Sequence, residues 1–223
     1  MMLAVYTLVF RHVMKVRWSG LDESNLSFAL RVYTGLVVFN FFAECVNRAS
    51  TLVLEQPQLV KKVVFPLEIL PWVSALSALA GLTVSGVILV ALTAFTDNGI
   101  PITAIALPVV WLPLLPLVIG LGWFLAGLGT YVRDVGQVFG MLVSALMFLS
   151  PIFFPVESLP ESVRGWLLLN PLAWVMTGSR DALLAGKWPD FGALFIVFLA
   201  CCLLALAGAA FFRKVRVGFS DVV

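Results

Sequence analysis

Side chains that could carry out acid–base or metal chemistry are scarce in this chain of 223 residues. The chain has a single histidine, His12, and three cysteines, of which Cys201 and Cys202 are adjacent in an apolar run while Cys45 stands apart. These spacings match no metal site, and cysteines in apolar runs are typical of small buried hydrophobic side chains. The carboxylates are isolated, and no Gly-x-x-x-x-Gly-Lys-Ser/Thr phosphate loop occurs. We therefore predict a protein that is not an enzyme, with no catalytic residue, no metal ligand and no cofactor of its own.

Apolar residues dominate the segments that would form helices and position the polar side chains. Hydrophobic residues make up 61% of the chain and charged residues 12%, whereas soluble domains carry about 25% charged residues. A helix needs roughly 20 apolar residues to cross a bilayer, where charges are costly. Four uncharged stretches exceed that length, namely Ile69 to Thr96, Asn98 to Val132, Val135 to Val156 and Phe191 to Phe212. The sequence therefore predicts an all-α integral membrane protein.

The apolar stretches predict about six helices in a single transmembrane domain, residues 1–223. The first is partial, and the set is 2–10, 26–46, 69–95, 101–131, 135–154 and 191–212. Segment 101–131 carries four prolines near its start, which favour one long, kinked helix. Gly136 and Gly140 form a small-xxx-small pattern that would let helices approach closely.

The polar connections differ from one another in length and charge. Segment 47–68 is too long for a simple turn, and segment 155–190 mixes charged and aromatic residues as short helices at an interface do. Net charge is only +2 and basic residues are scattered, which excludes a nucleic-acid surface. The positive-inside rule places the tail 213–223 in the cytoplasm, because the basic residues that gather on that side are Arg48, Lys61, Lys62, Arg133, Arg213, Lys214 and Arg216.

Several sequence blocks, in this order, resemble a known family. They are Leu54 to Pro71, Tyr131-Val-Arg-Asp-Val135, Ser150-Pro-Ile-Phe-Phe-Pro155 with Leu159-Pro160, Leu169-Asn-Pro171 and the tail Phe211 to Val223. Together they resemble the permease subunits of bacterial type 2 ABC exporters of polysaccharides, such as O-antigen, capsule and teichoic acid. The resemblance covers nearly the whole chain. Members of that family begin with an amphipathic helix and a complete first spanning helix, so this chain is expected to start inside that first helix, at Met1.

The resemblance implies a six-helix, multi-pass permease of the bacterial cytoplasmic membrane, with short re-entrant helices before the last spanning helix. It implies pairing with a second copy and with two separate ABC ATPase subunits that bind ATP and Mg. The implied cargo is a lipid-linked polysaccharide, moved among membrane lipids. Three alternatives stay open: a permease of the same architecture for a drug, lipid or other small molecule, a membrane-embedded lipid-modifying enzyme, and a membrane scaffold.

The resemblance also assigns roles to the cytoplasmic connections. Segment 47–68 would lie against the ATPase, with Glu55, Gln56, Lys61 and Lys62 as contact residues. The alternative is that the two lysines only anchor the loop at anionic lipid headgroups. Arg133 and Asp134 would form a second docking point, or else anchor two helix ends at the membrane surface.

The remaining predictions concern the residues of an outer gate and of a path for the cargo. In the resembling family, re-entrant helices close the outer mouth, which points to Trp166, Asn170 and Trp174; the alternative is an interfacial loop with an aromatic belt. Aromatic faces could stack on sugar rings along the path, and an arginine could meet phosphate. These path residues are Arg31, Tyr33, Phe39, Phe42 and Phe148, for which ordinary bundle packing and snorkelling are the alternatives.

Overall fold

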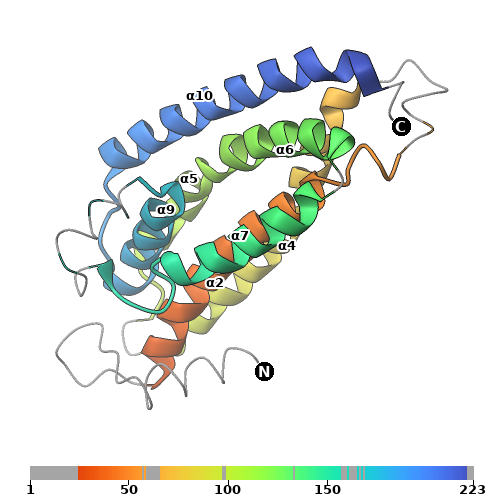
Figure 1. Cartoon of the computed structure of the whole chain (residues 1–223). Helices are drawn as coiled ribbons and strands as arrows, with labels where there is room; N and C mark the ends of the chain where they lie inside the picture. Colours follow the sequence, from red (N-terminus) through yellow and green to blue (C-terminus); the bar gives the residue numbers. More distant parts are fainter. Residues whose placement is uncertain are drawn as a thin grey trace. The chain divides into compact units, whose positions relative to one another are not determined.

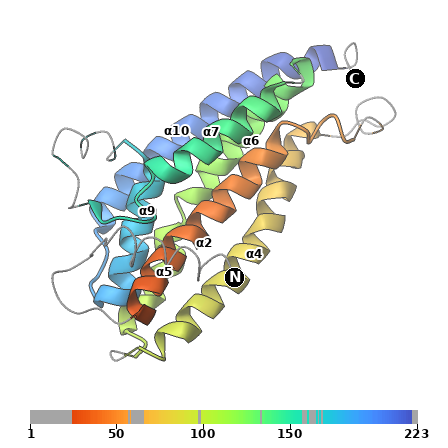
Figure 2. The same cartoon turned by 60° about the horizontal axis from the view of Figure 1, so that its bottom comes forward.

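The computed structural model describes residues 25–56, 58, 66–96, 99–132, 134–156, 160, 165, 167 and 169–219. In this part of the chain the regular structure is helical, which confirms the all-α prediction (Figures 1 and 2). Its elements are α2 (Asn25–Ala49), η2 (Leu67–Ile69), α4 (Leu70–Thr93), η3 (Ile102–Ala106), α5 (Leu107–Trp111), α6 (Leu114–Tyr131), α7 (Val135–Leu149), α9 (Pro171–Arg180), η5 (Asp181–Ala185), α10 (Phe191–Val215) and η6 (Arg216–Gly218). The predicted partial helix 2–10 lies outside the described residues.

Four helical segments are long and apolar enough to cross a membrane among the residues described. They are Leu26–Ala49, Leu67–Thr93, Ile102–Tyr131 and Phe191–Gly218. The third, predicted as one kinked helix, is divided into η3, α5 and α6. The break falls at Leu112 and Pro113, because proline lacks the N–H that would continue the helical hydrogen bonds.

Helix α7 is shorter than the sequence predicts. It spans 15 residues and ends at Leu149, whereas the apolar run suggested a spanning helix over 135–154. Ser150 and Pro151 follow, and the residue before a proline is disfavoured in the helical conformation. At 1.5 Å per residue, α7 rises about 22 Å, which is less than the roughly 30 Å of a bilayer core. Helix α7 therefore ends five residues before the predicted bound, and that 135–154 crosses the membrane as a full span stays a prediction.

Packing divides the chain into two compact units, which are described separately. Unit 1 comprises residues 1–40, 82–111 and 147–194, and unit 2 comprises residues 41–81, 112–146 and 195–223. The core of unit 1 contains Leu30, Leu89, Leu107 and Leu183. The core of unit 2 contains Val53, Ala126, Phe212 and Phe219. Whether the whole chain behaves as one domain stays a prediction.

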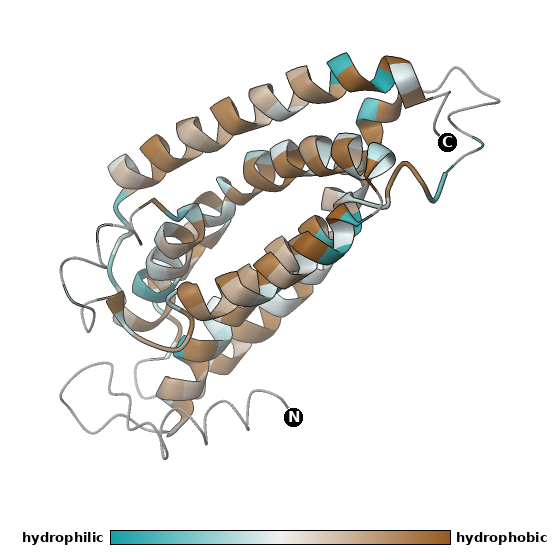
Figure 3. Ribbon diagram, viewed as in Figure 1, coloured by the Kyte–Doolittle hydropathy of each residue, from teal (hydrophilic) through white to brown (hydrophobic). Residues whose placement is uncertain are grey.

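Helices α4 and α10 expose apolar side chains over most of their length. Only 17% of the hydropathy window in Phe191–Gly218 is buried, and Ile196 and Leu206 are 69% and 67% exposed. Figure 3 shows α10 brown or pale along its length, turning teal only near its C-terminal end. Extended apolar surface of this kind is typical of a helix that faces lipid.

Candidate functional site

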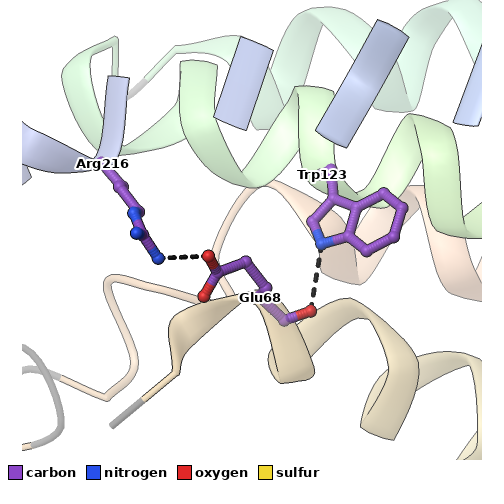
Figure 4. A network of polar contacts seen from close by, with 3 residues as sticks. All are labelled: Glu68, Trp123 and Arg216. Atoms are coloured by element: carbon purple, nitrogen blue, oxygen red, sulfur yellow. Dashed lines mark hydrogen bonds and ion pairs between the residues drawn. The ribbon is translucent and has the colours of Figure 1, made fainter. Parts of the chain in front are cut away.

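The first candidate site lies in unit 2 and joins the start of α4 to the end of α10. The carboxylate of Glu68 forms an ion pair with Arg216 Nη1. The Glu68 backbone carbonyl accepts a hydrogen bond from the indole N–H of Trp123, with a donor–acceptor distance of 3.0 Å. Figure 4 shows Glu68 between the two partners, its carboxylate facing Arg216 and its carbonyl facing Trp123. We call Glu68, Trp123, Tyr131, Val215 and Arg216 the C-terminal polar cluster.

A further hydrogen bond in this cluster holds the last residue of α10. The Tyr131 hydroxyl at the end of α6 donates to the Val215 carbonyl at 2.7 Å. The Tyr131 ring packs on Phe219, with centroids 5.9 Å apart, and Phe219 packs edge-on against Phe212 at 5.5 Å. Phe219 is 1% exposed. The apolar core of unit 2 therefore holds the chain up to Phe219 in place.

The turn after α2 packs tightly on the helices beside it in unit 2. A Cβ built on Gly129 would collide with the backbone carbonyl of Ser50, and one built on Gly136 would lie 2.8 Å from Ser50 Oγ. Gly140, the other half of the small-xxx-small pattern, has only an ordinary contact at 3.9 Å with Asn47 Oδ1. The turn at Ser50, within segment 47–68, is thus fixed against the end of α6 and the start of α7.

The second candidate site lies in unit 1 around Arg180, the last residue of α9. Arg180 is 4% exposed, and its guanidinium donates three hydrogen bonds. Nε donates to the Arg31 carbonyl at 3.0 Å, Nη1 to the Pro151 carbonyl at 2.6 Å and Nη2 to the Ile152 carbonyl at 2.9 Å. A buried charge is costly unless hydrogen bonds satisfy it, and hydrogen bonds from a charged donor are the stronger kind. We call Arg180 with these three carbonyl groups the Arg180 cluster.

Local sequence explains how α9 presents Arg180. Asn170 caps the helix because its Oδ1 accepts from the Leu172 N–H at 3.0 Å, and Pro171 follows at a position where helices tolerate proline. The Asn170 amide also donates to Ser150 Oγ at 3.2 Å. Helix α9 therefore begins directly after Asn170, at Pro171.

The structure describes some of the residues that were predicted to contact the ATPase. Glu55 and Gln56 are exposed at the end of the turn that follows α2. Asp134 is exposed directly before α7, where its carbonyl accepts from the Val138 N–H at 3.1 Å. A carboxylate there suits the positive end of a helix dipole. Lys61, Lys62 and Arg133 lie outside the described residues.

The predicted path residues do not form one group. Phe39 and Phe42 are 3% and 6% exposed on α2 and belong to different units. Tyr33 packs against the core of unit 1. Phe148 is 63% exposed near the end of α7 and lies 6.3 Å from the Phe153 ring. Arg31 is half-buried on α2, and its backbone carbonyl belongs to the Arg180 cluster.

Of the predicted gate residues, Asn170 caps α9 and Trp174 is partly exposed on the same helix. Trp166 lies outside the described residues. Among the described residues, no three His, Cys, Asp or Glu side chains are grouped so that they could hold a metal ion.

Sequence reasoning missed Glu68, Trp123, Arg216 and Arg180 as site residues. Glu68 and Arg216 are 148 residues apart, and Arg180 and Arg31 are 149 apart. Only Arg180 carried a local signal, since it and the adjacent Asp181 follow the uncharged stretch from Gly165 to Ser179.

Comparison with known proteins settles the family. A model described as ABC-2 type transporter matches residues 1–184. The chain belongs to the ABC-2 type transporter family. The matched part of this ABC-2 chain includes Glu68 and Arg180, whereas Arg216 lies beyond it.

Individual ABC-2 relatives match over most of the chain. The O-antigen export system permease protein RfbA of Myxococcus xanthus is 24% identical over 98% of this chain and 82% of its own length. The protein of the same name from Klebsiella pneumoniae is 22% identical over the same shares. The polysialic acid transport protein KpsM of Escherichia coli is 25% identical over 85% of this chain and 74% of its own length.

Proposed function

We propose that this chain is the membrane-spanning subunit of an ATP-driven exporter that moves lipid-linked polysaccharide across the bacterial cytoplasmic membrane. The observation that carries the proposal is the match, over 98% of the chain, to a permease named for O-antigen export. The similarity to a polysialic acid transport protein supports the same class of cargo. These names favour a polymer over a drug or a small molecule.

The energy for transport comes from another polypeptide in this proposal. The sequence contains no phosphate loop that could cradle a nucleotide. ATP and Mg therefore bind to two ABC ATPase subunits, which work with this chain and a second copy of it. The tail 213–223 lies in the cytoplasm, in agreement with the basic residues Arg213, Lys214 and Arg216 that begin it.

Segment 47–68 and Arg133-Asp134 form the contact with the ATPase. Exposure of Glu55, Gln56 and Asp134 supports this role, since a docking residue must be accessible. The C-terminal polar cluster supports it further, because Glu68 ends segment 47–68 and is bound to Trp123 and Arg216. A push on the loop would therefore move the start of α4 together with the end of α10.

The outer part of the path is formed by α9 and the aromatic residues. Asn170 and Trp174, with Trp166, make the gate. Of the predicted path residues, Arg31, Tyr33 and Phe148 line the route, whereas Phe39 and Phe42 are buried. The exposed ring of Phe148 is the best placed of the aromatic side chains for stacking on a sugar.

Deletion of the gene in the bacterium that encodes the chain tests the proposal. The expected result is loss of surface polysaccharide, with lipid-linked polymer accumulating inside the cell, and recovery when the gene is supplied on a plasmid. The readout is an immunoblot of surface and intracellular glycan. Unchanged surface glycan in the deletion strain would overturn the proposal.

A further inference from the structure

Arg180 joins three separate segments of unit 1. Its own helix is α9, the Arg31 carbonyl belongs to α2, and the Pro151 and Ile152 carbonyls belong to the turn after α7. An arginine guanidinium has five N–H donors in a planar fork, so it can bind several carbonyls at once. A lysine ammonium at the same place is a point charge and cannot reproduce this arrangement.

Gly35 provides the space that the guanidinium occupies beside α2. A Cβ on Gly35 would lie 2.7 Å from Arg180 Nη2 and 3.2 Å from the Ile152 Cα. Any larger side chain would push the guanidinium or the turn away from α2. The Arg180 cluster therefore depends on two residues on different helices.

Other hydrogen bonds hold the neighbourhood of Arg180 rigidly. The Trp111 indole N–H donates to Ser179 Oγ at 3.0 Å, and the Thr103 hydroxyl donates to the Ala182 carbonyl at 2.6 Å. At the other end of α9, the Asn170 amide donates to Ser150 Oγ. Arg180 at one end and Asn170 at the other thus bind α9 to the turn 150–152, while Trp111 and Thr103 bind α9 and η5 to α5 and η3.

We propose that Arg180 is a positioning residue for transport, which makes α2, the turn 150–152 and α9 move as one body. Helix α2 runs without interruption to Ala49, so its last residues already belong to segment 47–68. A displacement of its last turns therefore moves the Arg31 carbonyl, and through Arg180 it moves α9. This inference rests on the proposed function, in which segment 47–68 meets the ATPase and α9 belongs to the gate.

The test compares Arg180→Lys and Gly35→Ala with two matched controls, Arg213→Lys and Gly81→Ala. Arg213 is exposed after the apolar part of α10, and a Cβ on Gly81 would meet no atom within 4 Å. Each variant is expressed with its ATPase partner in the deletion strain. Four quantities are measured: surface polysaccharide, the amount of chain in the membrane, the thermal midpoint of the purified complex, and its basal ATP hydrolysis.

Both test variants are expected to lower surface polysaccharide about ten-fold, as the loss of hydrogen bonds from a buried charged donor implies. Membrane amount and basal ATP hydrolysis stay as in the wild type, the thermal midpoint falls because buried hydrogen bonds or close packing are lost, and both controls export normally. Export at the wild-type level in Arg180→Lys and Gly35→Ala would overturn the inference. So would a loss of the chain from the membrane in both, because the arginine would then serve folding alone. If the wild-type gene itself restores no surface polysaccharide, the proposed function fails instead.

Discussion

At the scale of single residues, the contacts most relevant to function join positions that are remote in sequence. The ion pair of Glu68 with Arg216 and the carbonyl contacts of Arg180 depend on how the helices pack. Local sequence does not specify such pairs, whereas it does specify caps. Asn170 followed by Pro171 is such a local pattern, since asparagine is favoured as the cap and proline as the first residue of a helix. The same reasoning could not have shown that Phe39 and Phe42 are buried, since phenylalanine suits both a core and a path.

Tyr131→Phe removes only the hydroxyl that donates to the Val215 carbonyl. We expect the free energy of unfolding to fall by about 1 kcal/mol, the net value of a typical hydrogen bond. The readout is the thermal midpoint of the detergent-purified protein. A midpoint equal to that of the wild type would show that this hydrogen bond does not stabilise the end of α10.

Gly129→Ala places a methyl group against the Ser50 carbonyl, so the backbone must shift. Overpacking of this kind costs about 1–3 kcal/mol. Gly140→Ala is the matched control on a neighbouring helix, because its Cβ would meet only Asn47 Oδ1 at an ordinary 3.9 Å. Thermal unfolding should therefore separate the two variants, and equal midpoints would contradict the close packing at Ser50.

At the scale of elements, length and the absence of charge predicted the spanning helices well. A long uncharged run can satisfy all of its backbone hydrogen bonds within one segment of a bilayer by forming a helix. The end of α7 was missed because an apolar run continues through Ser150 and Pro151, although the helix does not. Composition therefore located the apolar segments, whereas Pro113 and Pro151 mark where the helices within them are interrupted.

Helices α6 and α10 cross in unit 2 at small residues. A Cβ on Gly120 would lie 2.6 Å from the Ala205 Cα, and one on Gly208 would collide with the Gly120 carbonyl. Close backbone approach at small residues is a common way for membrane helices to associate. We expect Gly120→Ala and Gly208→Ala each to destabilise the protein by about 1–3 kcal/mol, while Gly81→Ala leaves the thermal midpoint unchanged or raises it. A midpoint unaffected by both substitutions would contradict the crossing.

At the scale of the whole molecule, the chain offers apolar surface to lipid and exposed charges to a partner. Glu55 and Glu44 are both exposed, but Glu44 has a neighbour of its own in Arg48, at 3.3 Å one turn along α2. Exposed pairs of this kind contribute little to stability, about 0–1 kcal/mol. Substitutions at Glu55 and at Glu44 can therefore be compared, to distinguish a loss of docking at Glu55 from a general effect of changed charge.

Reversal of charge at Glu55 and Lys61, by Glu55→Lys with Lys61→Glu, should uncouple ATP hydrolysis from export. The expected result is a large fall in surface polysaccharide while the ATPase partner still hydrolyses ATP. Glu44→Lys is the control and should export normally. Unchanged export in the reversed pair would leave segment 47–68 as a membrane anchor only.

The most direct test of the central claim is transport by purified components. This chain and its ATPase partner are placed in proteoliposomes that contain lipid-linked polysaccharide, and polymer reaching the far side of the membrane is measured by its accessibility to a glycan-cleaving enzyme. We expect translocation with ATP and Mg, and none when either this chain or ATP hydrolysis is removed. Equal translocation without the chain, or none from the complete set while ATP is hydrolysed, would contradict the central claim.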